Sequence, residues 1–207
     1  MELGPIIPEQ LSGEERFINT AKWLEFTVPD FWRWSASNLV SNATRGVLVE
    51  FLVGNAVGDS LSIRDEWAEY DLQSSTAIRI EVKSASFLQI WNQKRLSKVS
   101  FSYKKSQSFD SLTGQLKSEQ RRYADVYVFA VLAHSNQETL NPLDLSQWEF
   151  YVAPTTLLDK RLWSQHSISL PSLKAAFSAV TYSDLNRTVE MAGAEHQRMK
   201  QETMEIL

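Results

Sequence analysis

The stretch TAIRIEVKSASF, residues 76–87, decides how the middle of the chain folds. Its isoleucines and valine alternate strictly with arginine, glutamate and lysine, a period of two that is typical of a β-strand with one apolar and one charged face. Glu81 and Lys83 therefore project to the same side of the strand. Such a pair is either a solvent-facing edge, contributing about 0–1 kcal/mol to stability, or the floor of a site. Which other residues of the chain lie near this face decides between a solvent-facing edge and a functional site.

The composition describes a folded protein with no cysteine chemistry. Of the 207 residues, 43% are hydrophobic and seven are Trp, which favours one α/β domain over residues 1–207 and excludes a disordered chain. Since there is no Cys, disulfides and thiolate metal sites are excluded. No signal peptide and no apolar run of about 20 residues is found, so we expect a soluble, cytoplasmic protein. Residues 1–34 are expected to be an N-terminal elaboration of the domain.

Periodicity and turn residues predict the order of helices and strands. A long helix is expected within residues 35–58, ending at Gly54 or Gly58, and the continuous apolar run DVYVFAVLAH (125–134) predicts a buried strand. The remaining predicted elements are a helix over Gly13–Leu24, strands over 60–63, 66–72, 77–84 and 148–154, partly helical structure over 108–124, a short helix after Pro154, and a C-terminal helix over 183–207.

Asp71 lies in the segment WAEYDL (67–72), where Glu69 and Asp71 share one face. The short linker QSSTA lets this segment pair antiparallel with the next strand, which would bring Asp71 beside Glu81. Two carboxylates that close repel each other unless a cation lies between them. Ligation by oxygen alone suits magnesium or manganese.

Glu50 lies in RGVLVEFLVG, with three apolar residues on each side. Its helical neighbours three and four positions away are Gly or Val, so no base on its own helix can neutralise it. Burying a lone carboxylate costs several kcal/mol. Glu50 should therefore face a cavity, a remote Arg or Lys, or a metal ion; the alternative is a side chain that reaches water through a gap in the apolar stripe.

No acidic residue occurs between Val82 and Phe109, whereas six basic residues do. Local basicity marks either a face that binds a polyanion or an ordinary solvated edge. Within this segment we expect Lys94, Arg95 and Lys98 to contact DNA, and Trp91 and Phe101 to be core residues. Two features outside the segment have structural interpretations. Asp125 is expected to be a turn or cap residue, and FWRW (31–34) to be part of the core, with a stacking patch as the alternative.

A helix with Glu50, a segment with Asp71, the triplet Glu81-Val-Lys83, and then a strong strand resemble, in that order, the PD-(D/E)xK nuclease superfamily. The resemblance covers roughly residues 41–133. Asp71 follows Tyr70 where the family motif has Pro, and the literal Pro29–Asp30 precedes the Glu50 helix. Glu69 is an alternative to Asp71, because both project to one face.

The resemblance implies a restriction-endonuclease-like fold, a three-layer α/β core with a mixed β-sheet flanked by helices. It implies metal-dependent hydrolysis of phosphodiester bonds in DNA, with Mg²⁺ (Mn²⁺ as a substitute) held by Asp71, Glu81 and Glu50, and with Lys83 orienting the attacking water. A homodimer would fit cleavage of both strands. Two alternatives stay open: a protein that keeps this fold and binds or assembles on nucleic acid without cutting it, and a small-molecule hydrolase using the same site.

Overall fold

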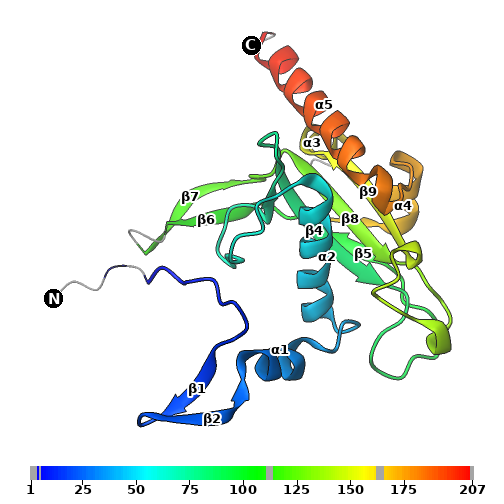
Figure 1. Cartoon of the computed structure of the whole chain (residues 1–207). Coiled ribbons are helices and arrows are strands. Elements are labelled where there is room, and N and C mark those ends of the chain that lie inside the picture. Colours follow the sequence, from blue (N-terminus) through cyan, green and yellow to red (C-terminus); the bar gives the residue numbers. More distant parts are fainter. Residues whose placement is uncertain (1–3, 5, 111–113, 162–165, 206–207) are drawn as a thin grey trace.

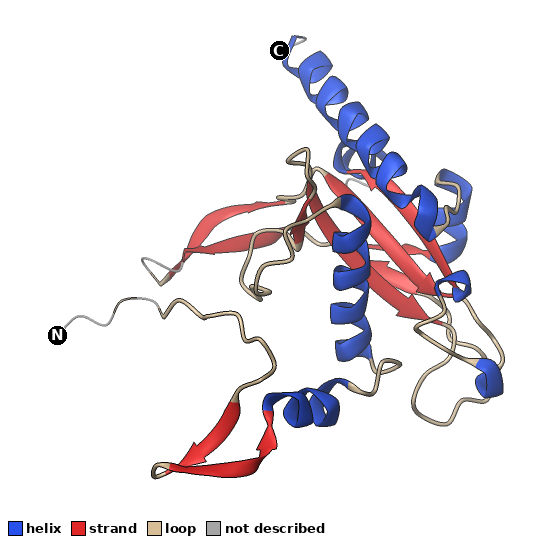
Figure 2. Cartoon of the chain, viewed as in Figure 1, coloured by secondary structure: helices blue, strands red, loops and turns tan. Residues whose placement is uncertain are grey.

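The computed structural model describes residues 4, 6–110, 114–161 and 166–205. A four-stranded mixed sheet stands at its centre, with helices packed on it (Figures 1 and 2). The elements are β1 (Arg16–Asn19), β2 (Lys22–Thr27), α1 (Val28–Ala36), α2 (Asn42–Val57), β3 (Leu72–Gln73), β4 (Arg79–Ser86), β5 (Ser100–Ser102), β6 (Ser106–Asp110), β7 (Gln115–Arg121), β8 (Val126–Leu132), β9 (Trp148–Pro154), α3 (Thr155–Arg161), β10 (Ser167–Ser169), α4 (Leu170–Ala176) and α5 (Leu185–Glu205), with short 3-10 turns at Gln137–Thr139, Leu145–Gln147 and Tyr182–Asp184.

The strand order of the central sheet is β3-β4-β8-β9. β4 and β8 run parallel, while β3 pairs antiparallel with β4 and β9 antiparallel with β8. All seven residues of β8 are buried, as a strand covered on both faces requires. The predicted α/β class, the strands over 77–84, 125–134 and 148–154, and the helices ending at Gly58, following Pro154 and closing the chain are confirmed.

Two layers cover the sheet. The face that carries Ile80 and Val82 packs against α2 and α5, whose buried residues include Val49, Val53 and Val189. The opposite face, with Tyr127 and Phe129, packs against β5, β10, α3 and α4. Since side chains alternate along β4, Glu81 and Lys83 lie on this second face.

The connection between parallel β4 and β8 contains no helix in its described residues. It holds β5 and the antiparallel hairpin β6–β7, with Ser106 opposite Arg121 and Gln107 opposite Gln120. The predicted partly helical structure over 108–124 is therefore wrong for the described residues. Gly114, with φ of 68°, adopts the left-handed conformation that suits a turn before β7.

The predicted helix over Gly13–Leu24 is also wrong, because β1 and β2 form a hairpin there. Thr20 and Ala21 both have positive φ, as a two-residue hairpin turn requires. Phe17 and Phe26 face each other across the strands with ring centroids 4.9 Å apart. A cross-strand aromatic pair stabilises the hairpin, and a helix would have separated the two rings.

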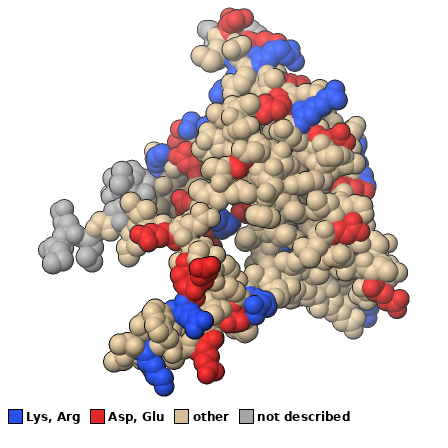
Figure 3. Space-filling view, in the orientation of Figure 1, with Lys and Arg blue, Asp and Glu red and all other residues tan. Residues whose placement is uncertain are grey.

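Residues 13–36, which we call the N-terminal arm, extend away from the sheet (Figure 1). Trp23 is 63% exposed and Trp34 84% exposed, so the expectation that residues 31–34 are core is wrong. Asp30, of the misleading Pro-Asp pair, accepts hydrogen bonds from the backbone N–H and hydroxyl of Thr27 at 2.8 Å each and caps α1. Figure 3 shows acidic and basic side chains side by side on the arm.

Of the strands predicted over 60–63 and 66–72, only Leu72 lies in a strand, β3, which continues to Gln73. Aspartates stabilise loop structure instead: Asp59 accepts the N–H of Leu61 at 2.7 Å, and Asp65 accepts that of Trp67 at 2.8 Å. Such side-chain turns compete with strand pairing. No helix in the described part of the chain is long and apolar enough to cross a membrane.

Candidate functional site

Asp71 stands directly beside Glu81, as the hairpin pattern predicts. Leu72 pairs with Ile80 in the β3–β4 ladder, and the Asp71 N–H donates to the Ile80 carbonyl at 3.1 Å. Asp71 directly precedes β3, and one of its carboxylate oxygens accepts the next amide of β4, the Val82 N–H, at 2.7 Å. The side chain of Asp71 thus extends the hydrogen bonding to β4 beyond the end of β3.

The electrostatic setting of Asp71 is unfavourable to a bare carboxylate. Burial, and then the negative charge of Glu81, raise the pKa of Asp71 to about 7. The charge of Glu50 acts in the same direction, while Lys83 and the Val82 N–H act against it. Three carboxylates therefore influence one another at the edge of the sheet, and a cation placed among them would relieve their repulsion.

Glu81 and Lys83 form an ion pair on the charged face of β4. Both side chains are partly exposed, at 21% for Glu81 and 32% for Lys83, so water and solutes reach them. Tyr127 lies beside Glu81 on the parallel strand β8. Its burial, followed by the charge of Glu81, raises the pKa of the Tyr127 hydroxyl above its usual value, which keeps that hydroxyl protonated as a hydrogen-bond donor.

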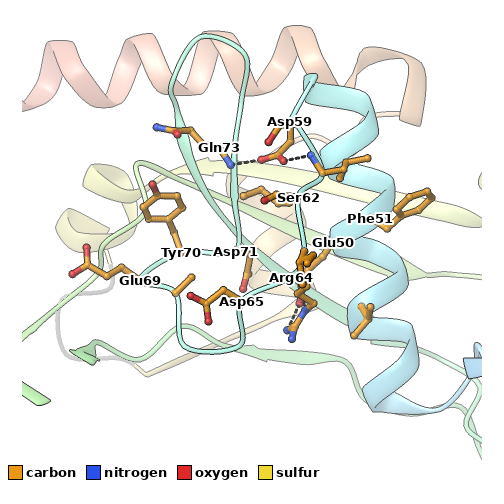
Figure 4. A pocket seen from close by; sticks show the side chains of 16 residues that line it. Glu50, Phe51, Asp59, Ser62, Arg64, Asp65, Glu69, Tyr70, Asp71 and Gln73 are labelled. Carbon is orange, nitrogen blue, oxygen red and sulfur yellow. Dashed lines mark hydrogen bonds and ion pairs between the residues drawn. The ribbon is translucent and has the colours of Figure 1, made fainter. Parts of the chain in front are cut away.

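Glu50 finds a remote arginine, one of the three surroundings that the sequence predicted for it. Arg64, from the irregular loop before β3, forms an ion pair with Glu50, with one guanidinium nitrogen 3.1 Å from the second carboxylate oxygen (Figure 4). The Glu50 side chain is only 14% exposed. The hydrogen bond to Glu50, followed by the negative charges of Glu50 and Asp71, raises the pKa of Arg64, so its guanidinium stays charged.

The four predicted catalytic residues line two cavities. Glu50, Arg64 and Asp71 line one of about 580 Å³, beside α2 (Figure 4). Glu81 and Lys83 line a second cavity of about 420 Å³, and Glu69 lines both. Asp71 thus shares a cavity with Glu50, while its hydrogen bond from Val82 and the charges of Glu81 and Lys83 link it to the charged face of β4.

Glu69, the alternative to Asp71, is engaged elsewhere. Its carboxylate lies 2.9 Å from the Lys117 ammonium on the β6–β7 hairpin. The hydrogen bond from Lys117 holds the pKa of Glu69 below its usual value. Glu69 lines both cavities, but Asp71 is the residue that stands opposite Glu81.

The carboxylates of Asp71, Glu81 and Glu50 are of a kind that binds divalent cations. In this structure, however, Glu81 and Glu50 are paired with cationic side chains. In the described ranges, no three His, Cys, Asp or Glu residues form a group that could hold a metal ion. Lys83 and Arg64 instead neutralise Glu81 and Glu50. Oxygen donors of Asp71, Glu81 and Glu50 would suit Mg²⁺ or Mn²⁺ if the two ion pairs opened.

Lys94, Arg95 and Lys98 are exposed on the loop between β4 and β5. Lys94 and Arg95 line a separate cavity with Gln137 and Glu138, and none of Glu50, Asp71 and Glu81 lines it. Of the two aromatic residues expected in the core, Phe101 is buried, whereas Trp91 is 55% exposed, so that prediction is wrong for Trp91.

Two residues that the sequence interpretation passed over also line the cavity of Glu81 and Lys83. They are Lys104 and Lys105, between β5 and β6. The signal that could have identified them is their position in the same acid-free segment. Only the path of the chain from β5 to β6 shows that they, and not the loop lysines, share this cavity.

Asp125 is more than a turn or cap residue, because it forms a buried polar cluster with Arg79 and His196. The Arg79 guanidinium donates to both carboxylate oxygens, at 2.6 and 3.0 Å. His196 Nε2 lies 3.3 Å from Asp125, and its Nδ1 accepts the Thr156 N–H at 3.3 Å. These contacts stabilise the junction of β4, β8 and α5, and explain the third charged residue of the opening stretch.

Neither the protein-family models nor the curated proteins contain a match to this chain.

Proposed function

We propose that this chain is a metal-dependent nuclease that hydrolyses phosphodiester bonds in DNA. The observation that carries the proposal is the half-buried Asp71 carboxyl opposite Glu81, with Lys83 on the same face of β4. A catalytic site is where burial and like charge are expected to raise a carboxyl pKa to near neutrality. The same observation supports the finer fold proposal, that the mixed α/β core is restriction-endonuclease-like.

In the proposed reaction, the acidic side chains would bind the metal ion and Lys83 would act on the water and the phosphate. Asp71 and Glu81 would hold a Mg²⁺ ion, with Glu50 as a direct or water-mediated ligand after exchange with Arg64. A bound divalent cation lowers the pKa of a coordinated water and offsets charge on the phosphate oxygens. Lys83, released from Glu81, would orient the attacking water and donate to the phosphate as negative charge develops.

Lysine side chains in the cavity of Glu81 and Lys83 support a phosphate substrate. Lys83, Lys104 and Lys105 line one cavity together with Glu69 and Glu81, and the excess of positive charge there favours an anionic ligand. A second candidate function is a non-cutting nucleic-acid-binding protein of the same fold. The two ion pairs favour this alternative, since Glu81 and Glu50 already have cationic partners without a metal ion.

A cleavage assay tests the proposal. Supercoiled plasmid and single-stranded DNA are incubated with Mg²⁺, with Mn²⁺ or with EDTA, and the products are separated on gels. We expect cutting that requires the metal and falls at least about 100-fold in Asp71→Asn and in Lys83→Ala, because each removes a group that acts on the reacting phosphate.

Asp71→Asn keeps an oxygen that can accept the Val82 N–H, so loss of activity would not merely report loss of fold. Lys200→Ala, an exposed lysine on α5, is the matched control and should cut like the parent protein. DNA binding without cutting under every metal condition would favour the non-cutting alternative. Equal cutting by parent and both site variants would show that the site lies elsewhere.

A further inference from the structure

The β6–β7 hairpin projects from the body beside the proposed site (Figure 1). Every residue of β7 is exposed. Its side chains are Gln, Leu, Lys, Ser, Glu, Gln and Arg, without an aromatic residue. A seven-residue strand extends about 23 Å at roughly 3.3 Å per residue. The hairpin thus presents a long polar ribbon to its surroundings.

Contacts along its length, including the turn end where Phe109 pairs with Leu116, fix the hairpin relative to the site. The Tyr123 hydroxyl accepts the Ser108 N–H at 3.2 Å and donates to the Glu119 carbonyl at 3.3 Å. The rings of Trp67 and Phe109 lie 5.4 Å apart. With the Lys117–Glu69 ion pair, these contacts tie the hairpin to the segment that ends in Asp71. A ligand held by the ribbon is therefore positioned against the site.

Positive charge leads from the cavity to the ribbon. Lys83, Lys104 and Lys105 line the cavity, and β6 begins at Ser106, directly after Lys105. Arg121, which pairs with Ser106 at the end of β7, lies over the Tyr123 ring at 4.6 Å. A polyanion that reaches Lys83 would pass these side chains.

We propose that the β6–β7 hairpin is a ribbon that enters the major groove of duplex DNA, with Lys104 and Arg121 contacting its phosphates. This inference rests on the proposed function for its choice of a nucleic acid. The major groove of B-DNA is about 12 Å wide and admits a two-stranded β-ribbon. The deep, narrow major groove of A-form RNA does not.

The side chains of the ribbon favour a duplex over a single strand. Proteins that bind single strands stack bases on exposed aromatic rings. β7 has none, and Phe109 on β6 packs against Trp67. Gln107 and Gln120, by contrast, lie opposite each other and are exposed. Glutamine amides donate and accept at once and match the major-groove edge of adenine.

Binding is measured by fluorescence anisotropy in EDTA, so that cutting plays no part. The probes are a 30-base-pair DNA duplex, one of its strands, and an RNA duplex of the same sequence. The double variant Lys104→Gln/Arg121→Gln should bind the DNA duplex at least tenfold more weakly. It should also lower the slope of log K against log salt by about 1.8, because about 0.9 is lost per phosphate contact.

The matched control Lys160→Gln/Lys200→Gln removes the same charge from α3 and α5 and should leave both quantities unchanged. Gln107→Ala/Gln120→Ala should keep the salt slope and reduce the discrimination between duplexes of different sequence. The proposal is overturned if the ribbon and control variants bind the DNA duplex equally, or if the parent prefers the single strand or the RNA duplex. Ribbon-dependent duplex binding in a protein that never cuts would support this inference while ending the proposal of a nuclease.

Discussion

At the residue scale, Asp71 shows how burial and neighbouring charge give one carboxyl group an unusual titration. Its backbone N–H completes the β3–β4 ladder, and its side chain accepts the next amide of β4. These contacts hold the carboxyl group where Glu81 and Glu50 both repel its ionised form. Asp71 therefore costs stability at neutral pH when no cation is bound, which is expected of a functional group and not of a structural one.

This leads to a prediction about pH. Because the folded pKa of about 7 lies above the unfolded value near 3.9, the native state binds the extra proton between these values. The contribution of Asp71 is thus fully present below about pH 4 and is lost as pH rises through about 7. In EDTA, Asp71→Asn should be more stable than the parent at pH 8 by at most about 4 kcal/mol, and the difference should disappear toward pH 4.

Urea unfolding followed by circular dichroism at several pH values measures this difference. Asp144→Asn, in an exposed turn outside the site, is the control and should show no gain at pH 8. A variant Asp71→Asn that is less stable than the parent at pH 8 would mean that the carboxylate has a stabilising partner. Addition of Mg²⁺ should raise the stability of the parent at pH 8 and leave Asp71→Asn unchanged.

At the scale of elements, the close approach of α5 to β4 depends on a glycine. A Cβ atom on Gly193 would lie 2.5 Å from Ile78 Cδ1 and 2.9 Å from Cγ1. Ile78 is β-branched and packs against the core, so it has little freedom to move. The same helix brings His196 to Asp125, so its distance from the sheet also determines the buried polar cluster.

Gly193→Ala should therefore destabilise the protein by about 1–3 kcal/mol through overpacking, although Ala favours a helix. Gly46→Ala is the matched control: it also lies inside a helix, α2, and a Cβ there would meet nothing within 4 Å. That variant should gain about 0.5–1 kcal/mol. Thermal unfolding compares the two. Ile78→Val removes Cδ1 but keeps Cγ1, so it should rescue Gly193→Ala in part. Equal effects of the two glycine substitutions would refute the close packing.

At the scale of the whole molecule, the N-terminal arm stands apart from the body. Within the described residues, its extensive contacts are internal: β1 packs on β2, and α1 on β2. It exposes several large apolar side chains, among them Trp23, Phe26 and Trp34. Large exposed apolar patches are typical of interaction sites. The homodimer that would fit cleavage of both strands would be expected to form through this arm.

Removal of residues 1–36 should change the free energy of unfolding by less than about 1 kcal/mol, because the core lies outside the arm. If the arm joins two copies, sedimentation velocity should show a dimer for the full chain and a monomer for the truncated one. Trp23→Ser/Trp34→Ser in the full chain should have the same effect as truncation. A truncated chain that unfolds, or that still dimerises, contradicts this role for the arm.

The sequence by itself determined the features that depend on local periodicity. Strict alternation in residues 76–87 placed Glu81 and Lys83 on one face, and the short linker before it placed Asp71 beside Glu81. The buried run of β8 and the glycine end of α2 were equally readable. In each case the signal lies within a few residues, because strand alternation and helix ends are local properties of the backbone.

Only the tertiary structure decided which distant groups meet. Arg64 reaches Glu50 from an irregular loop, and His196 reaches Asp125 from the last helix. Neither pair can therefore be predicted from a spacing along the sequence. The β6–β7 hairpin replaced an expected helical segment, because pairing between its two strands overrode local propensity. The path of the chain from β5 to β6 also brought Lys104 into the cavity that Lys83 lines. Contacts of this kind are chosen by the packing of the whole chain, whereas periodicity reports only which face of an element a residue occupies.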